Sequence, residues 1–236
     1  MDNNLFDKYK KKYGEKRDEL VFKAYELLAI GVEVVDPKRL DIRGNLSCGS
    51  NVKIDINVIF EGNVILENGV IVGANCILKD CKIGKNTILQ PFSLVDDAVI
   101  GESCFIGPYG RIRPGTCLGD SVQIGNFVEI KNAQISSKCR INHHAFVGDA
   151  DLAEQVTIGA GVITCNHDGV GINRTTIENG AYVGSGCNLV APLKIKANAT
   201  IASGSTITEE AAGNTLTIAR SRQVTIENWK RPKLRK

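Results

Sequence analysis

The sequence predicts an all-β protein, a parallel β-helix with one α-helix before it and a basic arm after it. Three observations support this prediction: aliphatic residues recur at every sixth position, glycine often follows them, and large rings are scarce. Of the 236 residues, 43% are hydrophobic but only 6% are aromatic, so Val, Ile, Leu, Ala and Cys must fill the core. Thin stacked layers suit such a core better than one bulky globular unit.

Residues 1–36 are expected to form an α-helix and a linker. Residues 4–28 are rich in Lys, Glu, Ala and Leu, and apolar residues between Leu20 and Leu28 form a stripe at helical spacing. Gly31 fits the end of this helix. The first residues are charged throughout and hold no signal-peptide pattern, and no apolar run reaches the length of a membrane span.

Residues 37–210 carry the six-residue repeat, which is typical of a β-helix whose coil is a triangle of three short strands. One aliphatic residue per repeat would point inward, and Gly, Asn and Asp would supply turns with positive φ. A β-sandwich would instead alternate with period two and turn every ~8–12 residues. The clearest series are Val52, Val58, Val64, Val70 and Cys76; Ile100, Ile106, Ile112, Leu118, Ile124 and Ile130; and Ile177, Val183, Leu189, Ile195, Ile201 and Ile207.

Two breaks and a charged end depart from the repeat. The first break is a short slip before Ile135, and the second is residues 165–175, which we expect to project as a loop on a binding face. Residues 211–236 form a basic arm, with seven basic residues and one acidic residue from Arg220 to Lys236. Such an arm is either a solvated tail or a tail that meets phosphates. It has too few aromatic residues to indicate nucleic-acid binding.

The cysteines and histidines do not indicate a metal site. The eight cysteines form no C-x-x-C motif, so we interpret them as reduced, buried or half-buried thiols of a cytoplasmic protein. There are three histidines, His143, His144 and His167. The adjacent pair on one rigid strand is poorly placed to chelate one ion, as β-helical carbonic anhydrases do with their histidines.

His143 is the candidate for proton transfer. The repeat places Ile141 and Val147 inward, so His143 falls at or near a coil corner, where a side chain can leave the coil. A lone histidine is more often structural than catalytic. Imidazole is nevertheless the natural general base near neutral pH, and it suits acyl transfer, in which an amine loses its proton as it attacks a thioester.

Several longer motifs span most of the chain. They are Asp41-Ile42-Arg43-Gly44, residues 59–64 (IFEGNV), Arg111-Ile112-Arg113-Pro114-Gly115, residues 125–131 (GNFVEIK), residues 159–166 (GAGVITCN), Leu189-Val190-Ala191-Pro192 and Trp229-Lys230-Arg231-Pro232. Together they resemble the C-terminal acetyltransferase half of the GlmU family, bifunctional enzymes that make UDP-N-acetylglucosamine. The resemblance covers residues 23–236, and the uridylyltransferase half, with its glycine-rich nucleotide loop, has no match.

The resemblance implies a left-handed β-helix and acetyl-CoA-dependent N-acetylation of glucosamine 1-phosphate, a step of cell-envelope biosynthesis. His143 would be the general base, Arg113 and Lys131 would hold the sugar phosphate, and the N–H of Ala160 would face the developing oxyanion. Asn166 would lie at the reacting amine and acetyl group. The cofactor positions implied are Ala160, Asn166, His167, Ser185, Ser203 and Arg220, and the further substrate positions are Phe146 and Thr157.

The resemblance also implies a cytoplasmic homotrimer, with active sites between neighbouring chains and no metal needed for acetyl transfer. The expected partners are acetyl-CoA and an amino-sugar phosphate, with no nucleic acid and no membrane span.

Several positions depart from the family pattern, mostly around the sugar. The departures are Phe146 for Tyr, Thr157 for Asn, Ile172 near a usual Lys, His167 for Tyr and Ser203 for Ala. Arg174 is a candidate to replace the missing lysine. Because the base and cofactor positions match better than the sugar positions, a second hypothesis is the same transfer to a different amino sugar or sugar nucleotide. A third hypothesis is a non-catalytic trimeric scaffold or regulatory paralogue.

Overall fold

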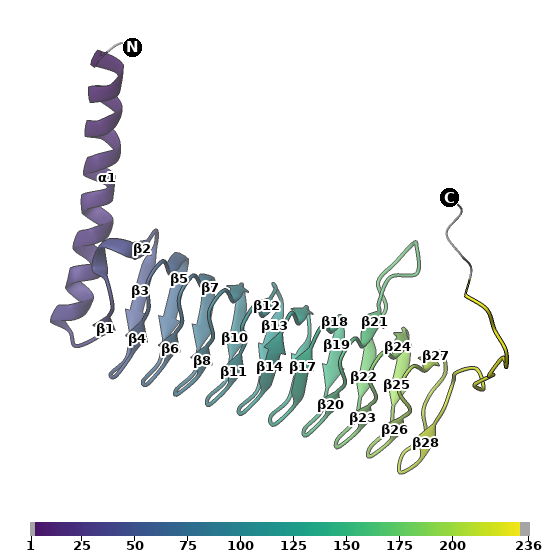
Figure 1. Ribbon diagram of the computed structural model, residues 1–236. Coiled ribbons are helices and arrows are strands. Elements are labelled where there is room, and N and C mark those ends of the chain that lie inside the picture. Colours follow the sequence, from purple (N-terminus) through teal and green to yellow (C-terminus); the bar gives the residue numbers. More distant parts are fainter. Residues whose placement is uncertain (1–2, 232–236) are drawn as a thin grey trace, which may run out of the picture.

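The computed structural model describes residues 3–231 and shows a long stack of parallel strands with one helix standing at its N-terminal end (Figure 1). Helix α1 spans Asn3–Ala29. The chain turns away from the helix at Gly31, whose φ is +87°, and the N–H of Val32 donates to the carbonyl of Leu27 at 3.0 Å. Ala24 and Leu27 are buried, so the C-terminal turns of α1 cover the first coil.

The apolar stripe of α1 is narrower than the sequence predicts. Tyr25 and Leu28 are 47% and 39% exposed, although both belong to the expected stripe between Leu20 and Leu28. The reason is that α1 stands against the end of the stack, where only its lower turns have a partner (Figure 1). Arg17 adds an ion pair with Asp41 on the first coil.

Each coil contributes strands to three faces. Face 1 is one parallel sheet of β1 (Glu33–Val34), β4 (Lys53–Ile54), β6 (Ile71–Val72), β8 (Ile88–Leu89), β11 (Phe105–Ile106), β14 (Gln123–Asn126), β17 (Arg140–His143), β20 (Thr157–Ile158), β23 (Tyr182–Val183), β26 (Thr200–Ile201) and β28 (Leu216–Thr217). A short 3₁₀ turn, Pro37–Arg39, joins face 1 to face 2 in the first coil.

Faces 2 and 3 share a second sheet, because β5 (Ile59–Leu66) and β7 (Ile77–Ile83) bend from one face into the other. Face 2 holds β2 (Asp41–Ile42), β9 (Leu94–Asp96), β12 (Arg111–Ile112), β15 (Glu129–Lys131), β18 (Phe146–Gly148), β21 (Ile163–Cys165), β24 (Asn188–Val190) and β27 (Thr206–Ile207). Face 3 holds β3 (Asn45–Cys48), β10 (Ala98–Ile100), β13 (Thr116–Leu118), β16 (Gln134–Ile135), β19 (Ala150–Leu152), β22 (Thr175–Ile177) and β25 (Leu193–Ile195).

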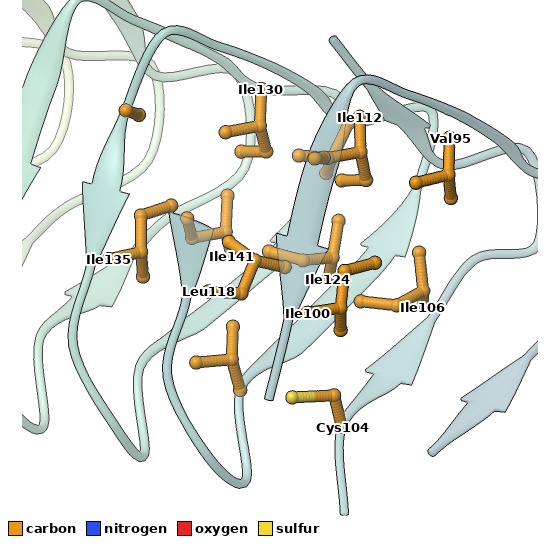
Figure 2. Packing of buried hydrophobic residues seen from close by; sticks show 14 of the residues in the cluster. Val95, Ile100, Cys104, Ile106, Ile112, Leu118, Ile124, Ile130, Ile135 and Ile141 are labelled. Atoms are coloured by element: carbon orange, nitrogen blue, oxygen red, sulfur yellow. The ribbon is translucent and has the colours of Figure 1, made fainter. Parts of the chain in front are cut away.

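The core is a column of aliphatic side chains from all three faces. In Figure 2, Ile106, Ile124 and Ile141 from face 1 meet Ile112 and Ile130 from face 2. The sequence predicts one inward residue per hexad, but most hexads have two, such as Val122 and Ile124, which are both fully buried. Of the two inward positions, the first takes the smaller side chains, including five buried cysteines: Cys76, Cys81, Cys104, Cys139 and Cys187.

All eight cysteines are free thiols, and seven are buried or half-buried as expected, but Cys117 is exposed, so the prediction is wrong for that residue. Burial raises the pKa of Cys76 and Cys139 to about 11 and that of Cys81 to about 12. These thiols therefore stay protonated near neutral pH and act as small apolar residues.

The register shows where the coil changes length. Lys53 pairs with Ile71, eighteen residues on, as three hexads require. Thr157 pairs instead with Tyr182, because the expected loop projects between β21 and β22 (Figure 1). The expected fold class, a parallel β-helix with an N-terminal α-helix and a C-terminal arm, is confirmed.

Parallel pairing runs from Glu33 to Thr217, so it begins before and ends after the range 37–210 taken from the repeat. The extra strands, β1 and β28, are two residues long, too short to show the period. Residues 218–231 form an extended, largely exposed arm. Residues 232–236, which include the last basic residues expected in the arm, lie outside the described residues. No helix among the described residues is long and apolar enough to cross a membrane.

Candidate functional site

His143 lies at the corner between face 1 and face 2, as the repeat predicts. It is the last residue of β17, its ring is exposed, and His144 turns the chain with a φ of +47°. The Nδ1 atom of His143 lies 2.6 Å from Oδ1 of Asn126, on the preceding coil. Because an amide oxygen only accepts, this contact requires a proton on Nδ1, and in the neutral form of the ring Nε2 is then the acceptor. The sequence analysis missed Asn126.

Beyond His143, the same corner continues as a line of glycines with positive φ: Gly161 (+72°), Gly186 (+69°) and Gly204 (+74°). The N–H of Gly161 donates to the carbonyl of His143 at 3.2 Å, so Ala160 lies one coil from the histidine. Since glycine has no side chain, the corner is open along this length.

The predicted cofactor positions follow one another along this open corner. The N–H of Gly186 donates to the carbonyl of Ala160 at 2.7 Å, and that of Gly204 donates to the carbonyl of Ser185 at 2.8 Å. Ser203 comes next, and its carbonyl accepts from Nη1 of Arg220 at 3.0 Å. Among the described residues, the N–H of Ala160 has no hydrogen-bond acceptor. One chain therefore aligns His143 with Ala160, Ser185, Ser203 and Arg220 in consecutive coils.

Before His143, the corner is aromatic. Phe92, Tyr109, Phe127 and His144 stack in consecutive coils, with centroids 5.0 Å apart in each pair. A cavity of about 410 Å³ lies beside them, and its lining includes Phe105, Tyr109, Phe127 and His143. The sequence analysis missed this column, although three of the few aromatic residues recur at the spacing of one coil.

Face 2 carries the predicted phosphate-binding cations. Nη1 of Arg113 lies 2.6 Å from Oε1 of Glu129, and Lys131 lies two residues beyond this glutamate on β15. Phe146 is on the next strand, where its half-buried ring lies over Gly148. Arg113, Lys131 and Phe146 therefore share one face, and His143 stands at its edge.

The opposite edge of face 2 holds a buried carboxylate that the sequence analysis missed. Asp149, with only 2% of its side chain exposed, accepts a hydrogen bond from Nδ2 of Asn132 at 2.5 Å and another from Nδ2 of Asn166. Nζ of Lys131 lies 3.8 Å from the same carboxylate. Burial would raise the pKa of Asp149, but the two amide donors, with Lys131 and Arg174 nearby, outweigh it and lower that pKa.

The projecting loop, residues 166–174, has an ordered base. Oδ1 of Asp168 accepts from the N–H groups of Val170 and Gly171 at 2.9 and 2.7 Å, and Nδ1 of His167 accepts from the N–H of Gly169 at 3.0 Å. Val170 at the tip is 96% exposed. His167 is thus part of a turn and lies away from the line of Ser185 and Ser203.

Two sugar-related positions do not meet the cations of face 2 in one chain. Thr157 lies on face 1 between Arg140 and Tyr182. Ile172 is 56% exposed on the loop. Arg174, the candidate replacement for a lysine, binds Asp151 through both Nε (3.0 Å) and Nη2 (2.5 Å). Its guanidinium is therefore already paired with a carboxylate of the same chain.

Within residues 3–231, no group of three or more His, Cys, Asp or Glu side chains is placed to hold a metal ion. The chemistry that the described residues offer is proton transfer at His143, hydrogen bonding from the open corner and anion binding on face 2.

The chain is similar to known proteins over most of its length. Residues 42–133 match the family described as GMPPB C-terminal domain. The bifunctional protein GlmU of Aromatoleum aromaticum is 48% identical over 209 residues, which is 89% of this chain and 46% of the relative. The bifunctional protein GlmU of Methylobacillus flagellatus is 54% identical over 209 residues, again 89% of this chain and 46% of the relative. The chain thus spans about half the length of the curated relatives it matches.

Among solved structures, a UDP-N-acetylglucosamine acyltransferase from Arabidopsis covers 80% of this chain and 70% of its own length, at 15% identity and a TM-score of 0.43. The sequence relationship is much closer than this structural one. On the strength of the identity over 209 residues, the chain is similar to the C-terminal half of the bifunctional GlmU proteins.

Proposed function

We propose that this chain transfers the acetyl group of acetyl-CoA to the amine of an amino-sugar phosphate, with glucosamine 1-phosphate as the acceptor. The observation that carries the proposal is the open corner. His143, Ala160, Ser185 and Ser203 follow one another along it, and Arg220 lies at its end beside Ser203. A long, narrow cofactor can lie along such a corner with its thioester at the histidine and its phosphates near the basic arm.

The reaction needs one base and one oxyanion donor. The amine attacks the thioester carbonyl, a C–N bond forms, and Nε2 of His143 takes the amine proton. As the tetrahedral intermediate collapses, the C–S bond breaks and the thiolate of coenzyme A leaves and is protonated. The free N–H of Ala160, next to the histidine along the corner, is the donor for the oxyanion.

The cations of face 2 support an anionic acceptor. Arg113 and Lys131 are held by Glu129 and Asp149, so their charged groups are already ordered on the face that His143 borders. Arginine binds phosphate through two parallel N–H donors, and lysine acts as a compact charge.

A second acceptor is favoured by two observations. Arg174 is bound to Asp151, and Phe146 has no hydroxyl group to offer on face 2. With fewer polar contacts to one phosphate, the same acetyl transfer can serve another amino sugar or a sugar nucleotide. We therefore keep this acceptor class as the alternative.

We also propose that the chain works as a homotrimer. In one chain face 2 is open, and His143 and Asn166 stand at opposite edges of it. The exposed column of Phe92, Tyr109 and Phe127 is an apolar surface of the kind that associates with another protein surface. Neighbouring copies would cover this surface and enclose the site.

The test compares His143→Ala with His144→Ala as a matched control. Product formation from acetyl-CoA and glucosamine 1-phosphate is followed by mass spectrometry, because the protein's own thiols interfere with thiol reagents. Loss of a general base lowers kcat by about 100- to 10,000-fold, so His143→Ala should fall by that factor while His144→Ala stays within about threefold of the wild type. A His143→Ala variant that keeps most of the rate would contradict the base assignment.

The acceptor is decided in the same assay with a panel of amino sugars, their phosphates and their nucleotides. We expect the highest kcat/KM with glucosamine 1-phosphate. A higher value with another member would favour the alternative acceptor. Tight binding of acetyl-CoA without turnover of any acceptor would contradict the proposed function and favour a scaffold.

A further inference from the structure

The buried carboxylate of Asp149 is unusual in what surrounds it. One oxygen accepts from Nδ2 of Asn132, and the other accepts from Nδ2 of Asn166 and faces Nζ of Lys131 at 3.8 Å. The backbone of Asp149 is also fixed, since its N–H donates to the carbonyl of Lys131 at 2.9 Å and its carbonyl accepts from the N–H of Thr175 at 3.1 Å. The carboxylate is therefore held in place and connects two strands of face 2 with the loop.

The carboxylate of Asp149 determines which way the amide of Asn166 points. An ionised carboxylate only accepts hydrogen bonds, so the NH₂ group of Asn166 must face Asp149. Its carbonyl oxygen Oδ1 then points away from Asp149, and among the described residues this oxygen accepts no hydrogen bond. Without the carboxylate, nothing would prevent the amide from turning over and presenting a donor in place of the acceptor.

We propose that Asp149 is a positioning residue whose Oδ2 atom binds both Nδ2 of Asn166 and the ammonium group of Lys131. The amide oxygen of Asn166 is thereby left free to accept from the reacting amine, so that one buried carboxylate aligns the amine contact and the phosphate contact. This inference rests on the acetyl transfer proposed above. Asp149 itself, being buried, touches neither substrate. The lowered pKa of Asp149 keeps the group ionised across the neutral range.

The key variant is Asp149→Asn. Asparagine accepts the φ of +50° at this position, and it keeps the shape of the side chain. It offers one acceptor oxygen in place of two, so its NH₂ group opposes either Asn132 or the pair Asn166 and Lys131, and in both orientations it lacks the negative charge that faces Lys131. We expect kcat for acetyl transfer to fall about 100-fold, the loss typical of misplaced reacting groups.

The matched control is Asn132→Gly, which removes the other amide donor to the same carboxylate. Glycine is compatible with the φ of +46° at Asn132, so the backbone is preserved. We expect kcat within about threefold of the wild type. A loss as large as that of Asp149→Asn would mean that Asp149 acts only through general stability, which would overturn the proposal.

Non-additivity tests whether Asp149 acts through Asn166. The double variant Asp149→Asn/Asn166→Ala should be no slower than Asn166→Ala alone, because residues that act as one unit lose their effect once. Losses that multiply, or an Asp149→Asn variant with an unchanged kcat, would refute the positioning role. If the wild type itself transfers no acetyl group, the proposed function fails first, and the two failures are thereby distinguished.

A spectroscopic readout keeps the inference testable if Asp149→Asn does not fold. In the wild type, the side-chain NH₂ signals of Asn132 and Asn166 should be shifted and exchange slowly, as charge-assisted hydrogen bonds require. Unshifted, rapidly exchanging signals for Asn166 would overturn the proposal without any variant.

Discussion

At the scale of single residues, Gly148 shows how closely the candidate site is packed. A Cβ at this position would lie 2.5 Å from Cζ of Phe146 and 3.2 Å from Nδ2 of Asn166. The missing side chain therefore lets the Phe146 ring lie over β18 beside the amide that Asp149 holds. A change at Gly148 acts on the proposed acceptor site through Phe146 and Asn166.

Gly148→Ala is expected to displace the Phe146 ring and raise the KM for the acceptor. Overpacking of this kind costs about 1–3 kcal/mol of stability, measured as a change in the free energy of unfolding. Gly14→Ala is the control, because nothing lies within 4 Å of its Cβ and it should be neutral or stabilising by about 1 kcal/mol. Equal KM values for Gly148→Ala and the wild type would show that Phe146 does not border the acceptor.

At the scale of elements, the loop between β21 and β22 is organised by its own side chains. Asp168 accepts from two backbone N–H groups and from Nδ2 of Asn173, and the carbonyl of Asn166 accepts from the N–H of Asn173 at 2.7 Å. These backbone donors, those of Gly171 and Val170 first, lower the pKa of Asp168 to about 2. The loop is thus closed at its base while Val170 remains exposed.

We expect Asp168→Ala to release this turn. The backbone amides of Val170 and Gly171 should then exchange with solvent about tenfold faster, while those of Asp149 and Thr175 stay protected. In the wild type, the pKa of Asp168 is lowered, so its carboxylate stabilises the turn fully above the ordinary pKa of about 3.9. This stabilisation is lost as the pH falls through about 2. Amide exchange that is unchanged in the variant would contradict this role for Asp168.

The strands themselves follow directly from the sequence, whereas their cross-coil partners do not. The hexad series locates inward residues such as Ile124 and Ile130, and it places His143 at a corner. Contacts between coils depend on coil length, which varies through slips and the loop. Asn126 meets His143 from seventeen residues away, and Asp149 meets Asn166 at the same spacing, without any motif that marks either pair.

The ion pair between Arg174 and Asp151 could not be predicted for the same reason. Its partner, Asp151, lies twenty-three residues earlier, on the other side of the loop insertion. Only the three-dimensional register brings the two together, and this changes Arg174 from a candidate phosphate ligand to an anchor of the loop.

At the scale of the whole molecule, one corner runs the length of the stack and changes character at the histidines. Stacked rings occupy it before His143, and positive-φ glycines occupy it afterwards. The central claim is that the glycine part of this corner holds acetyl-CoA, with the thioester at His143 and a neighbouring copy closing the site. Regular coils make this possible, because they repeat the same corner at a constant rise.

A crystal structure of the protein with coenzyme A tests this claim most directly. We predict electron density along the corner from His143 past Ala160 and Ser185 to Ser203, with the sulfur atom near the histidine, phosphates near Arg220, and a three-fold neighbour covering face 2. Density for coenzyme A in the aromatic cavity beside Phe105 and Tyr109, or chains that pack without enclosing His143, would contradict it.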